Sequence, residues 1–173
     1  GVGAGNVIGR EISDAHLQAC LDLGITLTGT NAEVALGQWE YQCLGKGIKA
    51  GDDLWMSRYL LHKVAEDFDV SVNIHPKPQS GDWNGSGMHT NFSNKEMREN
   101  GTEELYSTMC DKLGEVHQDA IANYGSDNDQ RLTGLHETQK ITDFSYGVSD
   151  RGASIRIPIY TVEHNWNGYL EDR

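Results

Sequence analysis

The sequence lacks the features that mark secreted and membrane proteins. It has only three cysteines, Cys20, Cys43 and Cys110, far apart and without a CxxC pair, which argues against a disulfide framework and indicates a reducing compartment. No apolar run approaches the length of a membrane span, and no charged-then-apolar start predicts a signal peptide. We therefore expect a cytoplasmic protein with no membrane partner.

Positive charge is also scarce. The chain has 14 lysines and arginines but 26 acidic residues, and the resulting net charge of −12 argues against nucleic acid as a partner. Any anionic ligand must find a local group of cations. Four of the seven arginines lie in the last quarter of the chain, and arginine forks match carboxylates and phosphates: Arg131, Arg151, Arg156 and Arg173.

Only three prolines are present, and none marks a linker, so the 173 residues predict one globular domain. Helical spacing of apolar residues predicts helices over 8–23, 52–68 and 102–124, the second capped by Gly51 or Asp52 and the third by Thr102. Alternation predicts strands over 25–28, 70–74, 88–92 and 153–157. Because helices and hairpin-like strand pairs are interleaved, we expect an α+β fold with an antiparallel β-sheet flanked by α-helices.

Residues 29–42, GTNAEVALGQWEYQ, are too rich in strand formers and glycine for a helix and predict a β-hairpin. A reversal centred on residues 36 and 37 places Glu33 directly across from Glu40. Opposed carboxylates repel, so solvent, a bound cation or uptake of a proton must offset the repulsion. A divalent metal is one answer, and two exposed glutamates on a solvated face are the other.

Residues 81–93, GDWNGSGMHTNFS, join a glycine-rich turn to a strand. Asn84-Gly85 is a hairpin-turn sequence, but Gly85 and Gly87 also allow a ligand to approach bare backbone. His89 follows directly, as either a metal ligand or a core histidine.

Residues 131–137, RLTGLHE, are too irregular for a helix or a strand. Arg131 and Glu137 therefore lie either on an ordinary surface loop or on a mobile lid whose glutamate enters a site on closing.

Residues 150–158, DRGASIRIP, place Arg156 on the face of a strand opposite the core residues Ile155 and Ile157, with Arg151 at its entrance. The alternative is an edge strand with a solvated arginine. In GYLEDR at 168–173, Glu171 and Arg173 are two apart and share a face of an extended segment.

The candidate site is rich in oxygen ligands with one imidazole, which suits Mg²⁺ or Mn²⁺ better than zinc or copper. Divalent cations beside arginines are typical of phosphoryl transfer, where charge neutralisation and positioning provide most of the catalysis.

These segments, in this order, closely resemble glutamine synthetases of the type II class. The resemblance covers essentially the whole chain and implies part of the catalytic domain, with the small N-terminal β-grasp domain, the first metal-binding strand and the C-terminal remainder absent. It implies that ATP phosphorylates the side-chain carboxylate of L-glutamate to γ-glutamyl phosphate, which ammonia converts to glutamine, ADP and phosphate being released. It also implies two or three Mg²⁺ or Mn²⁺ ions per site and a homo-oligomer of stacked rings with active sites between subunits.

The resemblance assigns roles by matching position. It implies metal ligands at Glu33, Glu40, His89 and Glu171. It implies glutamate-binding groups at Asn84, Gly85, Arg131 and Arg173, and nucleotide-side groups at Asn91, Ser93, Arg98 and Tyr169. Arg151 and Arg156 resemble the pair that stabilises the transferred phosphate, and Glu137 resembles the glutamate of the flap.

Two alternatives remain open at this point. One is a structural protein that kept this fold and lost its chemistry. The other is a γ-glutamyl ligase that uses an amine other than ammonia. We also expect the 173 residues alone to make no glutamine, because each metal would lack ligands.

Overall fold

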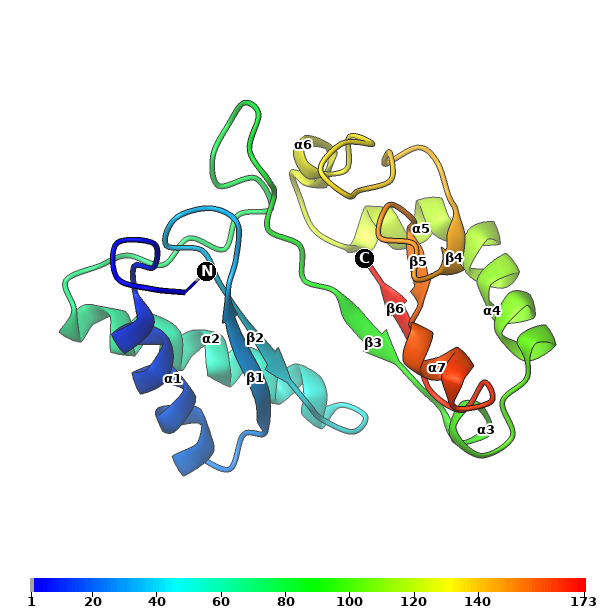
Figure 1. Cartoon of the computed structure of the whole chain (residues 1–173), viewed down its shortest axis with the longest axis horizontal. Coiled ribbons are helices and arrows are strands. Elements are labelled where there is room, and N and C mark those ends of the chain that lie inside the picture. Colours follow the sequence, from blue (N-terminus) through cyan, green and yellow to red (C-terminus); the bar gives the residue numbers. More distant parts are fainter. Residues whose placement is uncertain (1) are drawn as a thin grey trace. The chain divides into compact units, whose positions relative to one another are not determined.

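The computed structural model describes residues 2–173 and divides into two compact units, one reaching to Asn73 and one over Ile74–Arg173 (Figure 1). Each unit has its own buried cluster of apolar residues. None of the helices in the described part of the chain is long and apolar enough to cross a membrane.

The first unit packs two helices against a β-hairpin. Its elements are α1 (Arg10–Asp22), β1 (Leu27–Ala32), β2 (Trp39–Cys43) and α2 (Lys49–Asp67). Its core joins Cys20 of α1, Leu27 of β1 and Leu60 of α2. Both predicted helices are confirmed, but the predicted cap at Gly51 or Asp52 is wrong, because α2 begins one turn earlier, after Ile48, without a side-chain cap.

The hairpin was predicted correctly, and its register was not. The turn is where expected, since the N–H of Gln38 donates to Ala35 and Gly37 has a φ of 79°. However, Glu40 pairs with Asn31, and the N–H of Glu33 bonds to Gln38, so Val34 and Ala35 are extra residues in the loop. The pairing is therefore shifted by two residues, which keeps both glutamates on one face but places them diagonally.

The second unit is a four-stranded sheet with short helices. The strands are β3 (Thr90–Phe92), β4 (Tyr146–Val148), β5 (Ile155–Ile157) and β6 (Leu170–Asp172), in the order β3-β6-β5-β4. The helices are α3 (Lys95–Glu99), α4 (Glu103–Glu115), α5 (His117–Asn123), α6 (Asn128–Arg131) and α7 (Ile159–Glu163). The α+β class is confirmed, and the exception to the antiparallel pattern is β4, which runs parallel to β5.

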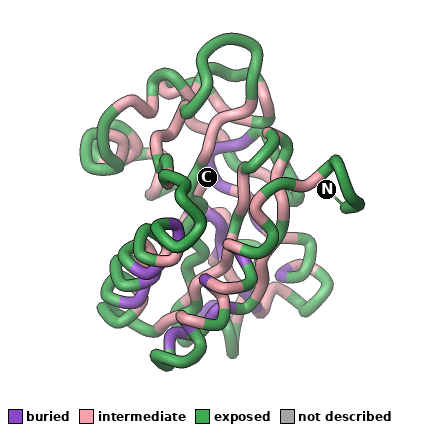
Figure 2. The backbone as a smooth tube through the Cα atoms, turned by 90° about the vertical axis from the view of Figure 1, so that its left-hand side faces the viewer, coloured by how far each residue is buried: buried purple, intermediate pink, exposed green. Residues whose placement is uncertain are grey.

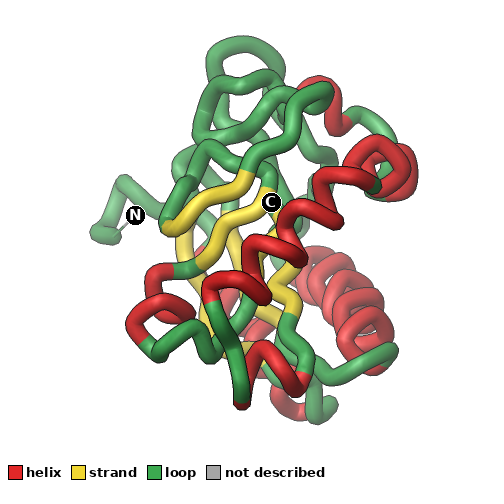
Figure 3. The backbone as a smooth tube through the Cα atoms, turned by 90° about the vertical axis from the view of Figure 1, so that its right-hand side faces the viewer, coloured by secondary structure: helices red, strands yellow, loops and turns green. Residues whose placement is uncertain are grey.

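Helix α4 covers one face of this sheet. In Figure 3 the red helices lie in front of the yellow strands, and Tyr106 and Cys110 of α4 pack on Ile155, Ile157 and Leu170. Figure 2 shows the buried positions in purple and the exposed loops in green. Because strand side chains alternate, residues next to these core positions on β5 and β6 point to the other face.

Other predictions, in this unit and in the segment that leads into it, needed tertiary information. The predicted helix over 102–124 is capped by Thr102 as expected, but it breaks at Val116 into α4 and α5. The predicted strand over 70–74 is wrong, because those residues have no hydrogen-bonded neighbour strand, and Asn84-Gly85 is consequently not a hairpin turn. The predicted strand over 88–92 is shorter, and β6 and α7 lie where loop was expected.

Candidate functional site

The carboxylate of Glu171, on β6, is the centre of the site in the second unit. Its Oε1 lies 2.8 Å from Nδ1 of His89, and its Oε2 accepts a 2.7 Å hydrogen bond from Nε of Arg156. Nε of Arg173 lies 3.5 Å from Oε1. The side chain of Glu171 is only 7% exposed, so solvent screens these interactions weakly. Four residues predicted from three separate segments are thus brought together.

These contacts set the charge of Glu171. Burial raises the pKa of its carboxyl group, but hydrogen bonds from His89 and Arg156 outweigh burial and hold that pKa below its usual value. The carboxylate is therefore ionised at neutral pH, as a group that binds cations must be.

Arg131 packs against the glycine-rich segment. A Cβ on Gly85 would stand 2.5 Å from Cγ of Arg131, and a Cβ on Gly87 would stand 2.5 Å from its Nη1. Real Cβ atoms do not approach other atoms this closely, and at Gly85 the carbonyl oxygen of Pro76 is also only 2.8 Å away, so this position needs glycine, whereas at Gly87 the end of the Arg131 side chain would have to shift. The group that approaches this backbone is an arginine of the chain itself, and the predicted approach of a ligand stays a prediction.

Arg131 and Arg173 both have buried nitrogen atoms without a hydrogen-bond partner: Nε of Arg131, and Nε and Nη1 of Arg173. Both arginines line a cavity of about 30 Å³, which holds about two water molecules. Burial and then the charge of Arg173 lower the pKa of Arg131, while burial and then Arg156 lower that of Arg173. Buried guanidinium nitrogens without a hydrogen-bond partner are unfavourable, so this pair favours an anionic ligand.

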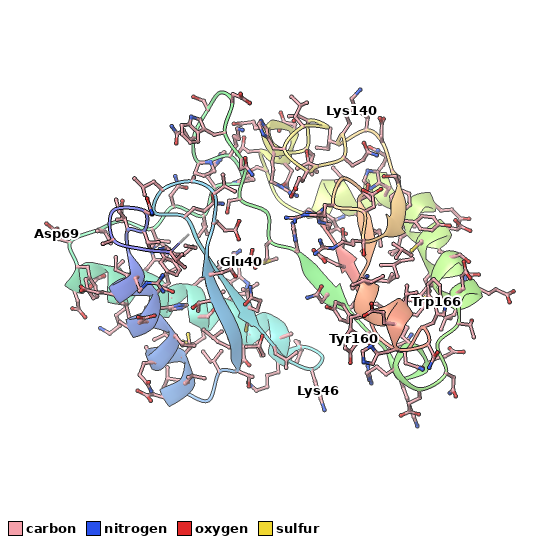
Figure 4. All side chains as sticks on the ribbon, viewed as in Figure 1. Glu40, Lys46, Asp69, Lys140, Tyr160 and Trp166 are labelled. Atoms are coloured by element: carbon pink, nitrogen blue, oxygen red, sulfur yellow. The ribbon has the colours of Figure 1, made fainter. Side chains whose placement is uncertain are left out.

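The segment that carries Glu137 is held by ion pairs and a strained backbone. Oε2 of Glu137 lies 2.9 Å from Nη2 of Arg151, and Nε2 of His136 lies 3.1 Å from Oδ1 of Asp82. His136 and Glu137 have φ angles of 54° and 60°, a region that residues with a Cβ rarely adopt. The segment continues to Lys140, which Figure 4 labels, and the partly exposed Glu137–Arg151 pair is weak enough to open.

The predicted nucleotide-side residues also converge. Oγ of Ser93 donates a 2.8 Å hydrogen bond to the carbonyl of Gly168, next to Tyr169, and Nη1 of Arg98 donates to the carbonyl of Ser93 at 3.1 Å. Asn91 pairs with Glu171 across β3 and β6. Asn91 therefore lies beside Glu171, and Ser93 links Arg98 to the chain next to Tyr169.

Glu33 and Glu40, in the first unit, share a polar hairpin face. Nδ2 of Asn31 donates to Glu33 at 2.6 Å, and Nε2 of Gln42 donates to Glu40 at 2.5 Å and to Asn31 at 3.1 Å. Figure 4 labels Glu40 on β2. Two linked amides therefore bridge the two carboxylates.

The donor chemistry fits a hard divalent cation, since carboxylate oxygens with one imidazole are ligands of Mg²⁺ and Mn²⁺. These groups occur in pairs: over residues 2–173 no group of three or more His, Cys, Asp or Glu side chains could hold a metal ion. Each pair can therefore supply part of a coordination shell.

Residues 8–124 match the family model described as glutamine synthetase, catalytic domain. The chain belongs to the glutamine synthetase family. It is 54% identical over its whole length to the glutamine synthetase of Schizosaccharomyces pombe, 56% to that of Panulirus argus and 52% to that of Saccharomyces cerevisiae, of which it covers 48%, 49% and 47%. The chain thus spans about half the length of the curated relatives it matches.

Sequence reasoning missed two sets of polar residues in the site. Asn31 and Gln42 bond to the acidic hairpin residues, and their alternation with core positions was a usable signal once the register was known. Asp172 lines the same cavity as Arg131 and Arg173, and only tertiary structure could show this.

Proposed function

We propose that this chain is part of the catalytic domain of an ATP-dependent glutamate–ammonia ligase, which joins ammonia to the side-chain carboxylate of L-glutamate. The observation that carries the proposal is the meeting of Glu171 with His89, Arg156 and Arg173 in a chain more than half identical to glutamine synthetases. The first metal-binding strand and the C-terminal remainder of the catalytic domain, and the separate N-terminal β-grasp domain, belong to a longer protein, a proposal supported by the chain spanning about half the length of the relatives it matches.

The arginines serve the two anionic substrates. Arg131 and Arg173, with their unpaired buried nitrogens, bind the carboxylates of glutamate beside Asn84 and Gly85. Arg156 and Arg151 stabilise the phosphate during its transfer. Asn91, Ser93, Arg98 and Tyr169 contact the nucleotide, and the hydrogen bonds of Ser93 and Arg98 support their grouping. Phosphorylation turns a poor electrophile, the carboxylate, into an acyl phosphate with a good leaving group.

Glu137 acts in the second step. When ammonia attacks the acyl phosphate, the carboxylate of Glu137 accepts the surplus proton of the incoming ammonium. Its loop closes over the intermediate and excludes water, which would otherwise hydrolyse it. The Glu137–Arg151 pair is the state of this loop without substrates, and closure requires that pair to change partners.

Two or three Mg²⁺ or Mn²⁺ ions, held in part by Glu33, Glu40, His89 and Glu171, supply the neutralisation of phosphate and carboxylate charge when bound. The three free cysteines are consistent with a cytoplasmic location. The working form is a homo-oligomer of stacked rings, in which neighbouring subunits share each site.

The test is an assay of the full-length protein that contains this chain. Glutamine and ADP should form in equal amounts from glutamate, ammonia and ATP, and only with Mg²⁺ or Mn²⁺ present. Hydroxylamine and small amines are compared with ammonia in the same assay. No ATP turnover with any amine would refute the ligase and favour a structural protein, and preference for another amine would refute ammonia as the substrate.

The 173-residue chain alone is the second arm of this test. Its metal-binding groups come in pairs, so it should form no glutamine, and sedimentation should give the full-length protein the mass of a multi-subunit ring. Robust synthesis by the chain alone would refute the proposal that it needs the remainder of the protein.

A further inference from the structure

The positive charges of the two cavity-lining arginines, Arg131 and Arg173, are not fully compensated by Glu171. Arg131 and Arg173 are both partly buried, and each carries buried nitrogen atoms without a hydrogen-bond partner. Their like charges repel, and the charge of Arg173 lowers the pKa of Arg131. Glu171 is already shared among His89, Arg156 and Arg173. A second anion near Arg131 would offset this repulsion when no substrate is bound.

Asp172 is that second anion. It is the last residue of β6, follows Glu171 directly, and lines the same cavity as Arg131 and Arg173. Strand alternation directs it to the side opposite Glu171, toward α5. Its negative charge raises the pKa of Arg131, against the effect of burial and of Arg173. His117, at the start of α5, also lies near Asp172.

Tyr124 fixes the position of Asp172. The hydroxyl of Tyr124, just after α5, donates a short hydrogen bond to Oδ2 of Asp172 across 48 residues of sequence. A carboxylate that is bonded on one side has fewer orientations toward its other neighbours, so the cations beside it are also better ordered. Tyr124 itself lies 51% exposed, so replacing it leaves no hole in the core.

We propose that Asp172, oriented by Tyr124, is a positioning residue that holds the guanidinium group of Arg131 ready to bind the carboxylate of glutamate. Neither Asp172 nor Tyr124 touches the reacting atoms in this account. The proposal rests on the proposed function for the identity of the ligand, but the ordering of Arg131 is a property of this chain alone.

The chain offers a matched control. Tyr146 on β4 donates a 3.1 Å hydrogen bond to Oδ1 of Asp111 on α4, which is the same pair of residue types in the same unit. That pair does not line the cavity. Tyr146→Phe therefore removes an equivalent bond without touching the residues beside Arg131.

Hydrogen exchange at the Nε–H groups of Arg131 and Arg173, followed by NMR in the ¹⁵N-labelled chain, tests the ordering directly. In the wild type the buried Nε–H of Arg131 should exchange slowly. Tyr124→Phe, which keeps the charge of Asp172 but loses the bond, should accelerate this exchange about fivefold, and Asp172→Asn, which loses the charge, about tenfold or more. Tyr146→Phe should leave it unchanged.

The second arm measures steady-state kinetics in the full-length protein. Tyr124→Phe should raise the KM for L-glutamate about fivefold and change kcat and the KM for ATP less than about twofold, because only the orientation of the glutamate-binding group is affected. Tyr146→Phe should match the wild type in every parameter.

The outcomes separate the two proposals. Unchanged exchange at Arg131 in both Tyr124→Phe and Asp172→Asn overturns the positioning role, and so does equal acceleration in Tyr146→Phe, since the effect would then be global. If the wild type neither binds nor uses glutamate, the proposed function fails, while the exchange experiment still decides the role of Asp172.

Discussion

Glu40 in the first unit and Glu171 in the second are both strand glutamates that the sequence marked as metal ligands, yet the fold treats them differently. Glu40 is exposed on a two-stranded hairpin and accepts a hydrogen bond from the amide of Gln42. Glu171 is buried on an interior strand between β3 and β5, against His89 and Arg156. The sheet of the second unit thus brings its own cations to its carboxylate, whereas the hairpin supplies only neutral amides.

Glu171 and Glu40 should differ most in how much the free energy of unfolding changes when each carboxylate is replaced by a neutral amide. Glu171→Gln leaves Arg156 and Arg173 without their shared anion, so the free energy of unfolding should fall by about 3 kcal/mol. Glu40→Gln should change it by less than about 0.5 kcal/mol, because the side chain is exposed. Urea denaturation of the 173-residue chain measures both. Equal losses of stability in Glu171→Gln and Glu40→Gln would show that the two glutamates do not differ in their contribution to the fold.

Glu137 provides the contrast to Glu171, because its proposed role is in catalysis and not in stability. Its contact with Arg151 is a partly exposed ion pair. In the full-length protein, Glu137→Ala should lower the rate of glutamine formation by about a hundredfold, the usual size of a general-base effect. Its midpoint of denaturation and its affinity for ADP should match the wild type. A variant that turns over at the normal rate would remove Glu137 from the mechanism.

Replacement of glycine by alanine should change the stability in opposite directions at Gly85 in the second unit and at Gly51 in the first. Gly85→Ala forces its Cβ against Arg131 and the carbonyl of Pro76, so we expect a loss of about 2 kcal/mol in stability. Gly51→Ala, within α2 and with open space around the Cβ, should instead stabilise by about 0.5 to 1 kcal/mol. Thermal denaturation reads out both, and a stabilising Gly85→Ala would show that Arg131 is not packed there.

The smallest effect is a pH dependence confined to the first unit. His16 is buried beside Cys20 and Tyr41, and burial lowers the pKa of its imidazole from 6.5. The unfolded chain therefore binds the proton more tightly, so this contribution to stability is complete above pH 6.5 and is lost as the pH falls below it.

Urea denaturation at about pH 7.5 and about pH 5.5 tests this, with His16→Gln as the comparison. The wild type should lose more stability between the two than His16→Gln does. A difference of the opposite sign would show that His16 gains a proton more readily in the folded chain.

The sequence predicted the features that depend on the spacing of residues within one strand or one short segment. Alternation in residues 150–158 placed Ile155 and Ile157 in the core and Arg156 on the other face, and the spacing of Glu171 and Arg173 placed them side by side. The class of fold followed from the interleaving of helices and hairpin strands.

Features that depend on long-range pairing could not be predicted. The hairpin register shifted because Val34 and Ala35 left the ladder, a choice that the turn sequence does not encode. The three-residue strand β6 exists only because β3 and β5 pair with it on both sides, and the role of Asp172 depends on Tyr124, 48 residues away. Short elements of this kind have too few residues for a periodic pattern.

A double-mutant cycle joining Glu171→Gln and Arg156→Gln tests the central claim most directly, namely that the buried charges of the second unit act as one network. Each unfolding free energy is measured by urea denaturation of the 173-residue chain. We expect a coupling energy of about 2 kcal/mol, because either single change leaves a buried partner uncompensated. A coupling energy near zero would contradict the claim, since it would mean that Glu171 and Arg156 contribute to the fold independently.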